Sequence, residues 1–168
     1  MIVLSRELAD EIRRHGEREY PHECCGLLIG RYEGEGRTRV IMETYAVANE
    51  FDVARLGEAF NENVVTPDGT DSIAGEERHH RMLIPPLEYV RAERLYAERG
   101  LGVVGNYHSH PDDRAVPSQF DLEHLAPWTT MSYIVVSVRD GRAVDLRSWE
   151  LETDRSKFNE EEIKRASD

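Results

Sequence analysis

The sequence predicts one α/β domain with a mixed central sheet and helices on its flanks. Two segments of helical length and pattern, near 5–18 and 86–99, alternate with short apolar runs that have the length of buried strands. The resulting order is helix, hairpin, helix and further strands, which is typical of a mixed sheet covered by helices. The chain has 168 residues, of which 39% are hydrophobic, and this suits a single soluble domain with a sizeable core.

The first helix is predicted to run from Ser5 to about Arg18. Serine is a favoured N-cap residue, because its hydroxyl can accept a hydrogen bond from the first turn. Leu8 and Ile12 lie one turn apart, on the face that we expect the core to bury. Pro21 should end the helix, since proline cannot continue the backbone hydrogen bonds.

A hairpin is predicted next. The apolar run 24–32 is too short for a helix and reads as a buried strand, residues 33–36 contain two turn-forming glycines, and 38–47 forms the return strand. Residues 57–77 contain glycine, asparagine and aspartate with little periodicity. We therefore expect a surface excursion there, within a single domain that spans residues 1–151.

The second helix is predicted to begin at Pro86, after a short strand at 81–84, and to end near Arg99. Its apolar residues recur at i, i+3 and i+8, which predicts one buried face. The residues expected on that face are Leu87, Val90 and Leu95.

Three more strands are predicted, at 101–107, 132–138 and 143–151. The last two are joined by the turn 139–142, whose Asp-Gly pair is typical of a β-hairpin. The charged tail 152–168 is expected to form a loosely docked helix or to be disordered.

Charge and composition disfavour several partners. With 33 acidic against 21 basic residues, the net charge of −12 disfavours nonspecific binding to nucleic acid or to an anionic membrane. No apolar run approaches the roughly 20 residues that cross a bilayer, and two adjacent cysteines are too few for a disulfide framework. These features predict a cytoplasmic protein and leave an oligomer possible.

The segment 107–121 predicts a metal site. His108 and His110 lie two residues apart on an expected strand, so their imidazoles point to the same side. Pro111 favours an exit into a loop, and the loop is long enough to return the carboxylate of Asp121 to the same place. Two imidazoles and one carboxylate suit zinc and leave its fourth position for water, as in catalytic zinc sites. A His-x-His pair alone also arises by chance, because isolated histidines are usually surface or core residues.

The full string strengthens the metal interpretation, because it resembles the signature of the JAMM (JAB1/MPN/Mov34) metallopeptidases. The residues that match this signature are His108, Ser109, His110, Ser118 and Asp121. The similarity extends over roughly residues 4–151, with a gap at 57–77, and is greatest to small bacterial members of the family. It implies the family's fold, a three-layer α/β sandwich similar to that of cytidine deaminases.

The resemblance also implies roles for single residues. His108, His110 and Asp121 would bind zinc, which lowers the pKa of a bound water. Glu23, placed before the first buried strand like the family's glutamate, would be the general acid/base, with a pKa raised toward neutrality by partial burial. Ser118 would donate a hydrogen bond to the oxyanion. The alternatives are a surface glutamate at position 23 and a helix N-cap at position 118.

The bacterial members that the chain resembles act on ubiquitin-like sulfur-carrier proteins that end in Gly-Gly. The resemblance therefore implies zinc-dependent hydrolysis at the C-terminus of such a carrier, with release of cysteine in cysteine biosynthesis. The carrier's tail would add a strand to a sheet edge near the metal. The alternatives are isopeptide cleavage, as in a deubiquitinase, and a noncatalytic scaffold, which the complete residue set disfavours. A nucleoside deaminase is disfavoured because its zinc-binding cysteine pair is absent.

Other polar residues near these positions have simpler interpretations. His124 follows the last ligand by one helical turn and is expected to be exposed or to support a ligand rather than to bind metal. Cys24 and Cys25 should point to opposite faces of a strand, with one of them in the core, and no histidine is spaced to activate a thiol. Asp112 and Asp113 either shape a substrate groove or are solvated.

Overall fold

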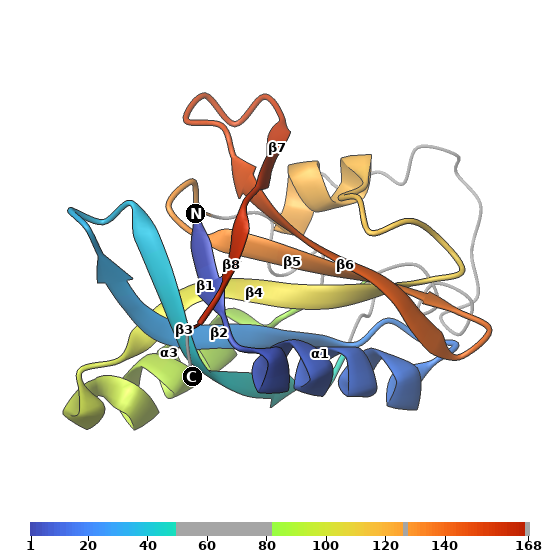
Figure 1. Cartoon of the computed structure of the whole chain (residues 1–168), viewed down its shortest axis with the longest axis horizontal. Coiled ribbons are helices and arrows are strands. Elements are labelled where there is room, and N and C mark those ends of the chain that lie inside the picture. Colours follow the sequence, from blue (N-terminus) through green and yellow to red (C-terminus); the bar gives the residue numbers. More distant parts are fainter. Residues whose placement is uncertain (50–81, 126–127, 167–168) are drawn as a thin grey trace.

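The computed structural model describes residues 1–49, 82–125 and 128–166. In this part of the chain eight strands form one mixed sheet in the order β7-β6-β5-β4-β2-β3-β1-β8 (Figure 1). The predicted excursion at 57–77 lies outside the described residues. The strands are β1 (Ile2–Leu4), β2 (Cys25–Glu33), β3 (Thr38–Val47), β4 (Gly102–Pro111), β5 (Ser132–Arg139), β6 (Arg142–Leu151), β7 (Phe158–Glu161) and β8 (Ile163–Arg165).

The mixed sheet agrees with the predicted α/β fold. β2 pairs with β3 and with β4 in antiparallel fashion, as do β5 with β6 and β6 with β7, whereas β4 and β5 run parallel. The hairpin predicted from residues 24–47 is confirmed, and so is the tight turn between β5 and β6. At that turn Asp140 and Gly141 both have positive φ, of 49° and 75°, as a two-residue hairpin turn requires.

Helix α1 (Arg6–Glu19) covers one face of the sheet and begins where the sequence predicts. The hydroxyl of Ser5 accepts a hydrogen bond from the backbone N–H of Leu8 at 3.2 Å. Ile12 is fully buried and packs in a cluster with Leu28 of β2. Across the described residues, no helix is long and apolar enough to span a membrane.

Helix α3 (Pro86–Tyr96), extended by the turn η2 (Ala97–Arg99), covers the opposite face. The prediction of its buried face is wrong: the exposed fractions of Leu87, Val90 and Leu95 are 55%, 44% and 62%. The helix instead buries Ala92 and Tyr96, while the hydroxyl of Tyr89 accepts a hydrogen bond from Asn106 of β4 at 3.3 Å. The tyrosine rings fill the space above the sheet, so packing rather than hydrophobicity selects the face.

The strand predicted at 81–84 is also wrong for the described residues 82–84, which have no regular structure. The backbone N–H of Leu83 donates to the side-chain oxygen of Asn49 at 3.2 Å rather than to a neighbouring strand. All three residues are buried, so their apolar character reflects burial without sheet pairing.

A β-bulge in β4 decides which face of the sheet receives His108 and His110. The pairing of β2 with β4 shifts register and leaves Val104 without a partner. Val104 and Tyr107 therefore both pack on the α1 side, although strict alternation would place residues three apart on opposite faces. The histidines consequently lie on the α3 side.

The C-terminal tail completes the sheet, so the prediction of a docked helix or disorder is wrong for residues 158–165. β7 pairs with β6, and β8 pairs with β1 at the other end of the strand order (Figure 1). Between them, the fully buried carboxylate of Glu161 accepts hydrogen bonds from Arg39 and from Ser148, each at 2.7 Å. The charged composition of the tail predicted a solvated segment, but the carboxylate of Glu161 is paired inside the protein.

We expect the substitution Arg39→Met to lower the free energy of unfolding by about 3 kcal/mol, because it removes the guanidinium that faces a buried carboxylate. The N-terminal amine, 2.9 Å from Glu161, would remain as a partner and limit the effect. Urea denaturation followed by circular dichroism measures the change. The control is Arg37→Met, because Arg37 pairs with Glu35 at the exposed surface. Equal denaturation midpoints for both variants would contradict this role of Arg39.

Candidate metal centre

Three side chains from two segments converge on the α3 side of β4. The Nε2 atoms of His108 and His110 are 3.0 Å apart, and each lies 3.4 Å from a different carboxylate oxygen of Asp121. All three side chains are buried. Among the described residues they form the one group of His, Cys, Asp and Glu side chains close enough together to hold a metal ion. The structure thus brings together the three residues that the sequence predicts as metal ligands.

Asp121 is held in place by Ser118. A short helical segment leads into the π-helical turn η3 (Asp121–Leu125). The carboxylate of Asp121 accepts a hydrogen bond from the backbone N–H of Ser118 at 2.5 Å, and the hydroxyl of Ser118 accepts one from the backbone N–H of Asp121 at 3.2 Å. This reciprocal pair is a capping box. The exposed Ser118 hydroxyl keeps its own proton to donate to another group.

His110 is oriented by a backbone contact on the far side of its ring. Its Nδ1 lies 3.0 Å from the carbonyl oxygen of Arg114, and since a carbonyl can only accept, Nδ1 carries the proton. When the ring is neutral, its unprotonated nitrogen is therefore Nε2, the atom that faces Asp121. In His108 it is Nδ1 that is buried without a hydrogen-bond partner in the described residues, so the polar contacts of this ring are confined to the Nε2 side.

The charges of the three residues depend on one another. Burial alone would raise the pKa of Asp121, but the neighbouring imidazoles of His108 and His110 hold it well below its ordinary value. Burial would lower the pKa of His110, whereas the hydrogen bond to Asp121 and its negative charge raise it. The carboxylate is therefore ionised, as a metal ligand must be, and a bound metal ion would replace a proton in this cluster.

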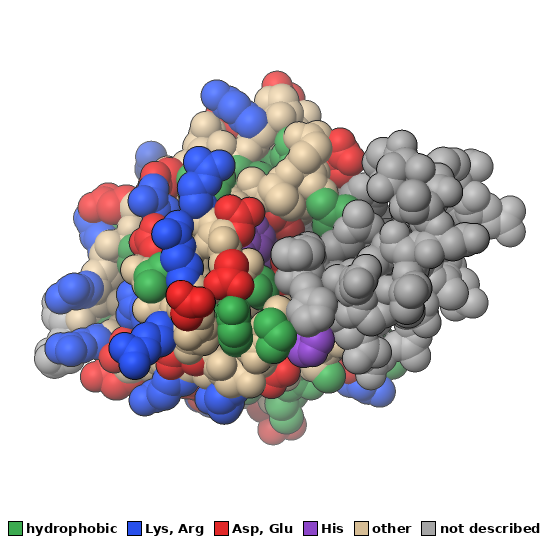
Figure 2. All heavy atoms as spheres, turned by 90° about the vertical axis from the view of Figure 1, so that its right-hand side faces the viewer, with side chains coloured by type: hydrophobic (Ala, Val, Ile, Leu, Met, Phe, Trp, Pro, Cys, Tyr) green, Lys and Arg blue, Asp and Glu red, His purple; other side chains and the backbone are tan. Residues whose placement is uncertain are grey.

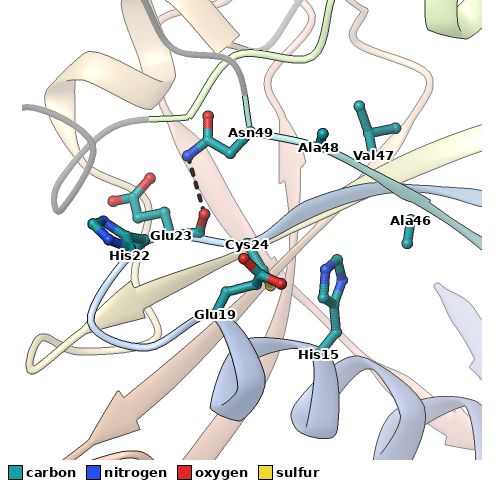
Figure 3. Close-up of a pocket in the computed structure, with 9 residues that line it drawn as sticks. All are labelled: His15, Glu19, His22, Glu23, Cys24, Ala46, Val47, Ala48 and Asn49. Carbon is teal, nitrogen blue, oxygen red and sulfur yellow. Dashed lines mark hydrogen bonds between the residues drawn. The ribbon is translucent and has the colours of Figure 1, made fainter. Parts of the chain in front are cut away.

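Glu23 lies where β2 begins, beside the strand that carries the histidines. Cys25 pairs with His108, and the backbone N–H of Ser109 donates to the carbonyl of Cys24 at 3.1 Å. Continued by one residue, this register brings Glu23 opposite His110. The side chain of Glu23 is buried. It also lines a cavity of about 310 Å³, where its carboxylate and that of Glu19 point in different directions (Figure 3).

Asn49 is a residue that the sequence reasoning missed. Its side-chain amide donates to the carbonyl of Glu23 at 3.0 Å, shown as a dashed line in Figure 3, and its side-chain oxygen accepts from the N–H of Leu83. One asparagine thus ties the end of β3 to the backbone of Glu23 and to the chain that enters α3. An asparagine after a strand is common in loops, so the sequence carried no signal for this role.

The remaining polar residues have structural roles. Both cysteines are buried, one on each face, because helices cover both sides of the sheet. Burial raises the pKa of the Cys24 thiol to about 12 and that of Cys25 well above its usual value, so neither is a thiolate nucleophile. Asp112 accepts hydrogen bonds from the Tyr20 hydroxyl at 2.8 Å and from the N–H of Asp140 at 3.0 Å, and so closes a loop. The side chain of His124 lies outside the described part.

Comparison with known proteins gives matches along nearly the whole chain. A family model described as prokaryotic homologues of the JAB domain matches residues 5–152. The CysO-cysteine peptidase of Mycobacterium tuberculosis is 26% identical over 151 residues, which cover 90% of this chain and 83% of that peptidase.

Solved structures agree with the fold. The solution structure of a Desulfitobacterium hafniense protein is 25% identical, has a TM-score of 0.73, and covers 100% of this chain and 94% of its own. A JAB1/MPN domain protein from Archaeoglobus fulgidus is 18% identical with a TM-score of 0.54, over 99% of this chain and 100% of its own. At 18% identity, the similarity to the Archaeoglobus fulgidus protein concerns the fold alone. That fold is the three-layer α/β sandwich predicted in the sequence analysis.

Proposed function

The chain belongs to the family of prokaryotic homologues of the JAB domain, and on that premise we propose that it is a zinc-dependent peptidase. The observation that carries the proposal is the buried convergence of His108, His110 and Asp121. In a tetrahedral site with zinc–nitrogen bonds of about 2.0 to 2.1 Å, neighbouring ligand atoms are roughly 3.3 Å apart. The distances of 3.0 and 3.4 Å between the three side chains fit that geometry. Three protein ligands also leave one position open.

Zinc bound by these residues would polarise a peptide carbonyl and make water a stronger acid. Glu23 is proposed to accept the proton of the attacking water and to pass it to the leaving amine. Its burial supports this role, because a carboxylate shielded from bulk solvent is a stronger base. Ser118 is proposed to donate its hydroxyl proton to the developing oxyanion. The hydrogen bond from His110 to the Arg114 carbonyl keeps the imidazole in the orientation that a ligand needs.

The proposed substrate is a ubiquitin-like sulfur-carrier protein with a Gly-Gly tail that bears a C-terminal cysteine. The proposed reaction hydrolyses the last peptide bond and releases cysteine. The similarity to a CysO-cysteine peptidase, which extends over most of both chains, supports this substrate. Because β4 is paired by both β2 and β5, a strand added by the tail would have to join another edge of the sheet.

The test is to incubate the zinc-loaded protein with a carrier that ends in Gly-Gly-Cys and to follow its intact mass. We expect loss of one cysteine residue, whereas a control carrier that ends in Gly-Gly should keep its mass. An isopeptide-linked conjugate is assayed in parallel. Cleavage of the conjugate alone would replace the proposed substrate by the isopeptide class. Cleavage of neither substrate by protein with stoichiometric zinc would contradict the peptidase assignment.

A further inference from the structure

A second cavity, of about 340 Å³, lies next to the candidate metal centre and is lined by arginine side chains. Its walls come from the loop after β4, from β5 and from β6. The side chains that give it charge are Arg114, Arg139, Arg147 and Asp145. This volume is in the range of small-molecule sites, which begin at roughly 300 Å³.

The cavity and the metal centre share their surroundings. Ser137, in the cavity wall, is the β5 residue that pairs with His110 in the parallel β4·β5 ladder. Arg114, which also lines the cavity, accepts the hydrogen bond from His110 through its carbonyl. The indole N–H of Trp149 donates to the carbonyl of Ala115 at 3.1 Å and holds this loop against β6. A ligand in the cavity would therefore lie one strand away from the histidines, on the same face of the sheet.

Two of the three guanidinium groups are available to a ligand. Arg147 pairs with Asp145 at 2.8 Å and with Glu160 at 3.5 Å, so its charge is balanced within the protein. Arg114 and Arg139 form no ion pair with any other residue of the described ranges. Two arginines that line one cavity and have no ion-pair partner among the described residues favour an anion.

The positive charge of the cavity contrasts with the chain's net charge of −12. Figure 2 looks onto the end of the molecule where the loop after β4 and the β5–β6 turn lie, and the described surface there carries several Lys and Arg side chains among acidic ones. Asp112 and Asp113, the acidic residues of the loop, do not line the cavity, and Asp113 accepts a hydrogen bond from the backbone N–H of Arg114 at 2.7 Å.

We propose that Arg114 and Arg139 bind the free C-terminal carboxylate of the residue that the enzyme releases. This role rests on the proposed function, and it identifies residues that would select the terminal peptide bond. Guanidinium groups bind a carboxylate through paired, charge-assisted hydrogen bonds. A residue at the very end of a chain carries a carboxylate next to the scissile bond, whereas the lysine of an isopeptide bond has none at that position. The cavity therefore favours the terminal peptide bond over the isopeptide bond.

The test measures binding without turnover, on the zinc-loaded full chain carrying Glu23→Gln. Calorimetric titration compares the peptide Gly-Gly-Ala with its C-terminal amide. We expect the acid to bind at least about tenfold more tightly, as the loss of one charge-assisted pair would predict. Arg139→Gln should remove this preference. Arg94→Gln is the matched control, because Arg94 is exposed on α3 and does not line the cavity, and it should keep the preference.

Equal affinity for acid and amide would overturn the inference, as would a preference that survives Arg139→Gln or no binding of either peptide at millimolar concentration. Binding of Gly-Gly-Asp amide as tight as that of the Gly-Gly-Ala acid would assign the cavity to acidic side chains instead. Since no hydrolysis is involved, an intact acid preference in a protein that cleaves no carrier would contradict the proposed function alone.

Discussion

Replacement of Glu23 by glutamine is expected to lower kcat for the carrier substrate by about 10²- to 10⁴-fold, the usual contribution of a general acid/base. Glutamine has nearly the same size and can fill the same buried position, but it cannot accept a proton from water. Metal binding should not change, because Glu23 is not among the three converging side chains. The measurements are the rate of cysteine release and the zinc content of each purified variant.

The matched control for this experiment is Glu19→Gln. Glu19 lines the same cavity as Glu23 and undergoes the same chemical change, but it belongs to α1 on the other side of the sheet (Figure 3). We expect this variant to keep its rate within a few-fold. Equal loss of activity in both variants would mean that activity depends on the charge or shape of the cavity and not on Glu23 as a specific base. Full activity of the Glu23 variant would contradict the assignment of the base.

Replacement of His108 by alanine is expected to abolish both metal binding and hydrolysis. Loss of an outer partner of a metal ligand costs about 10- to 100-fold in affinity, and loss of a ligand itself should exceed that. His108 is the best ligand to test, because Asp121 also caps a helix and His110 also holds the Arg114 loop. Zinc content by mass spectrometry and the rate of cysteine release measure the two effects.

Thermal denaturation gives a readout of metal binding that does not depend on activity. A ligand that binds only the folded state raises Tm, so added zinc should raise the Tm of the wild type and of the control His22→Ala but not that of His108→Ala. His22 is exposed and precedes Glu23 in the chain. A zinc-dependent rise in the Tm of His108→Ala would contradict the ligand assignment.

The elements with strong local signals were predicted correctly. The cap at Ser5, the β2–β3 hairpin and the Asp140-Gly141 turn each depend on residues within a few positions of one another. The buried face of α3 was predicted wrongly, because apolar residues occur on more than one side of this helix. Packing against the sheet buries the side that carries Ala92 and Tyr96. The strands of the tail could not be predicted, since the partners that stabilise the buried Glu161 lie far away in the sequence, Arg39 by 122 residues.

For the candidate site, the sequence by itself determined the local geometry. The spacing of His108 and His110 on a strand puts them on one side, and Ser118 with Asp121 forms a capping box over three residues. The tertiary structure alone decided which face of the sheet the histidines occupy, through the bulge at Val104. It also decided that the backbone of Glu23 lies beside the end of β4 and that Arg114 and Arg139 line one cavity. The reason is physical: short-range periodicity sets the direction of neighbouring side chains, whereas the pairing register between distant strands depends on the packing of the whole sheet.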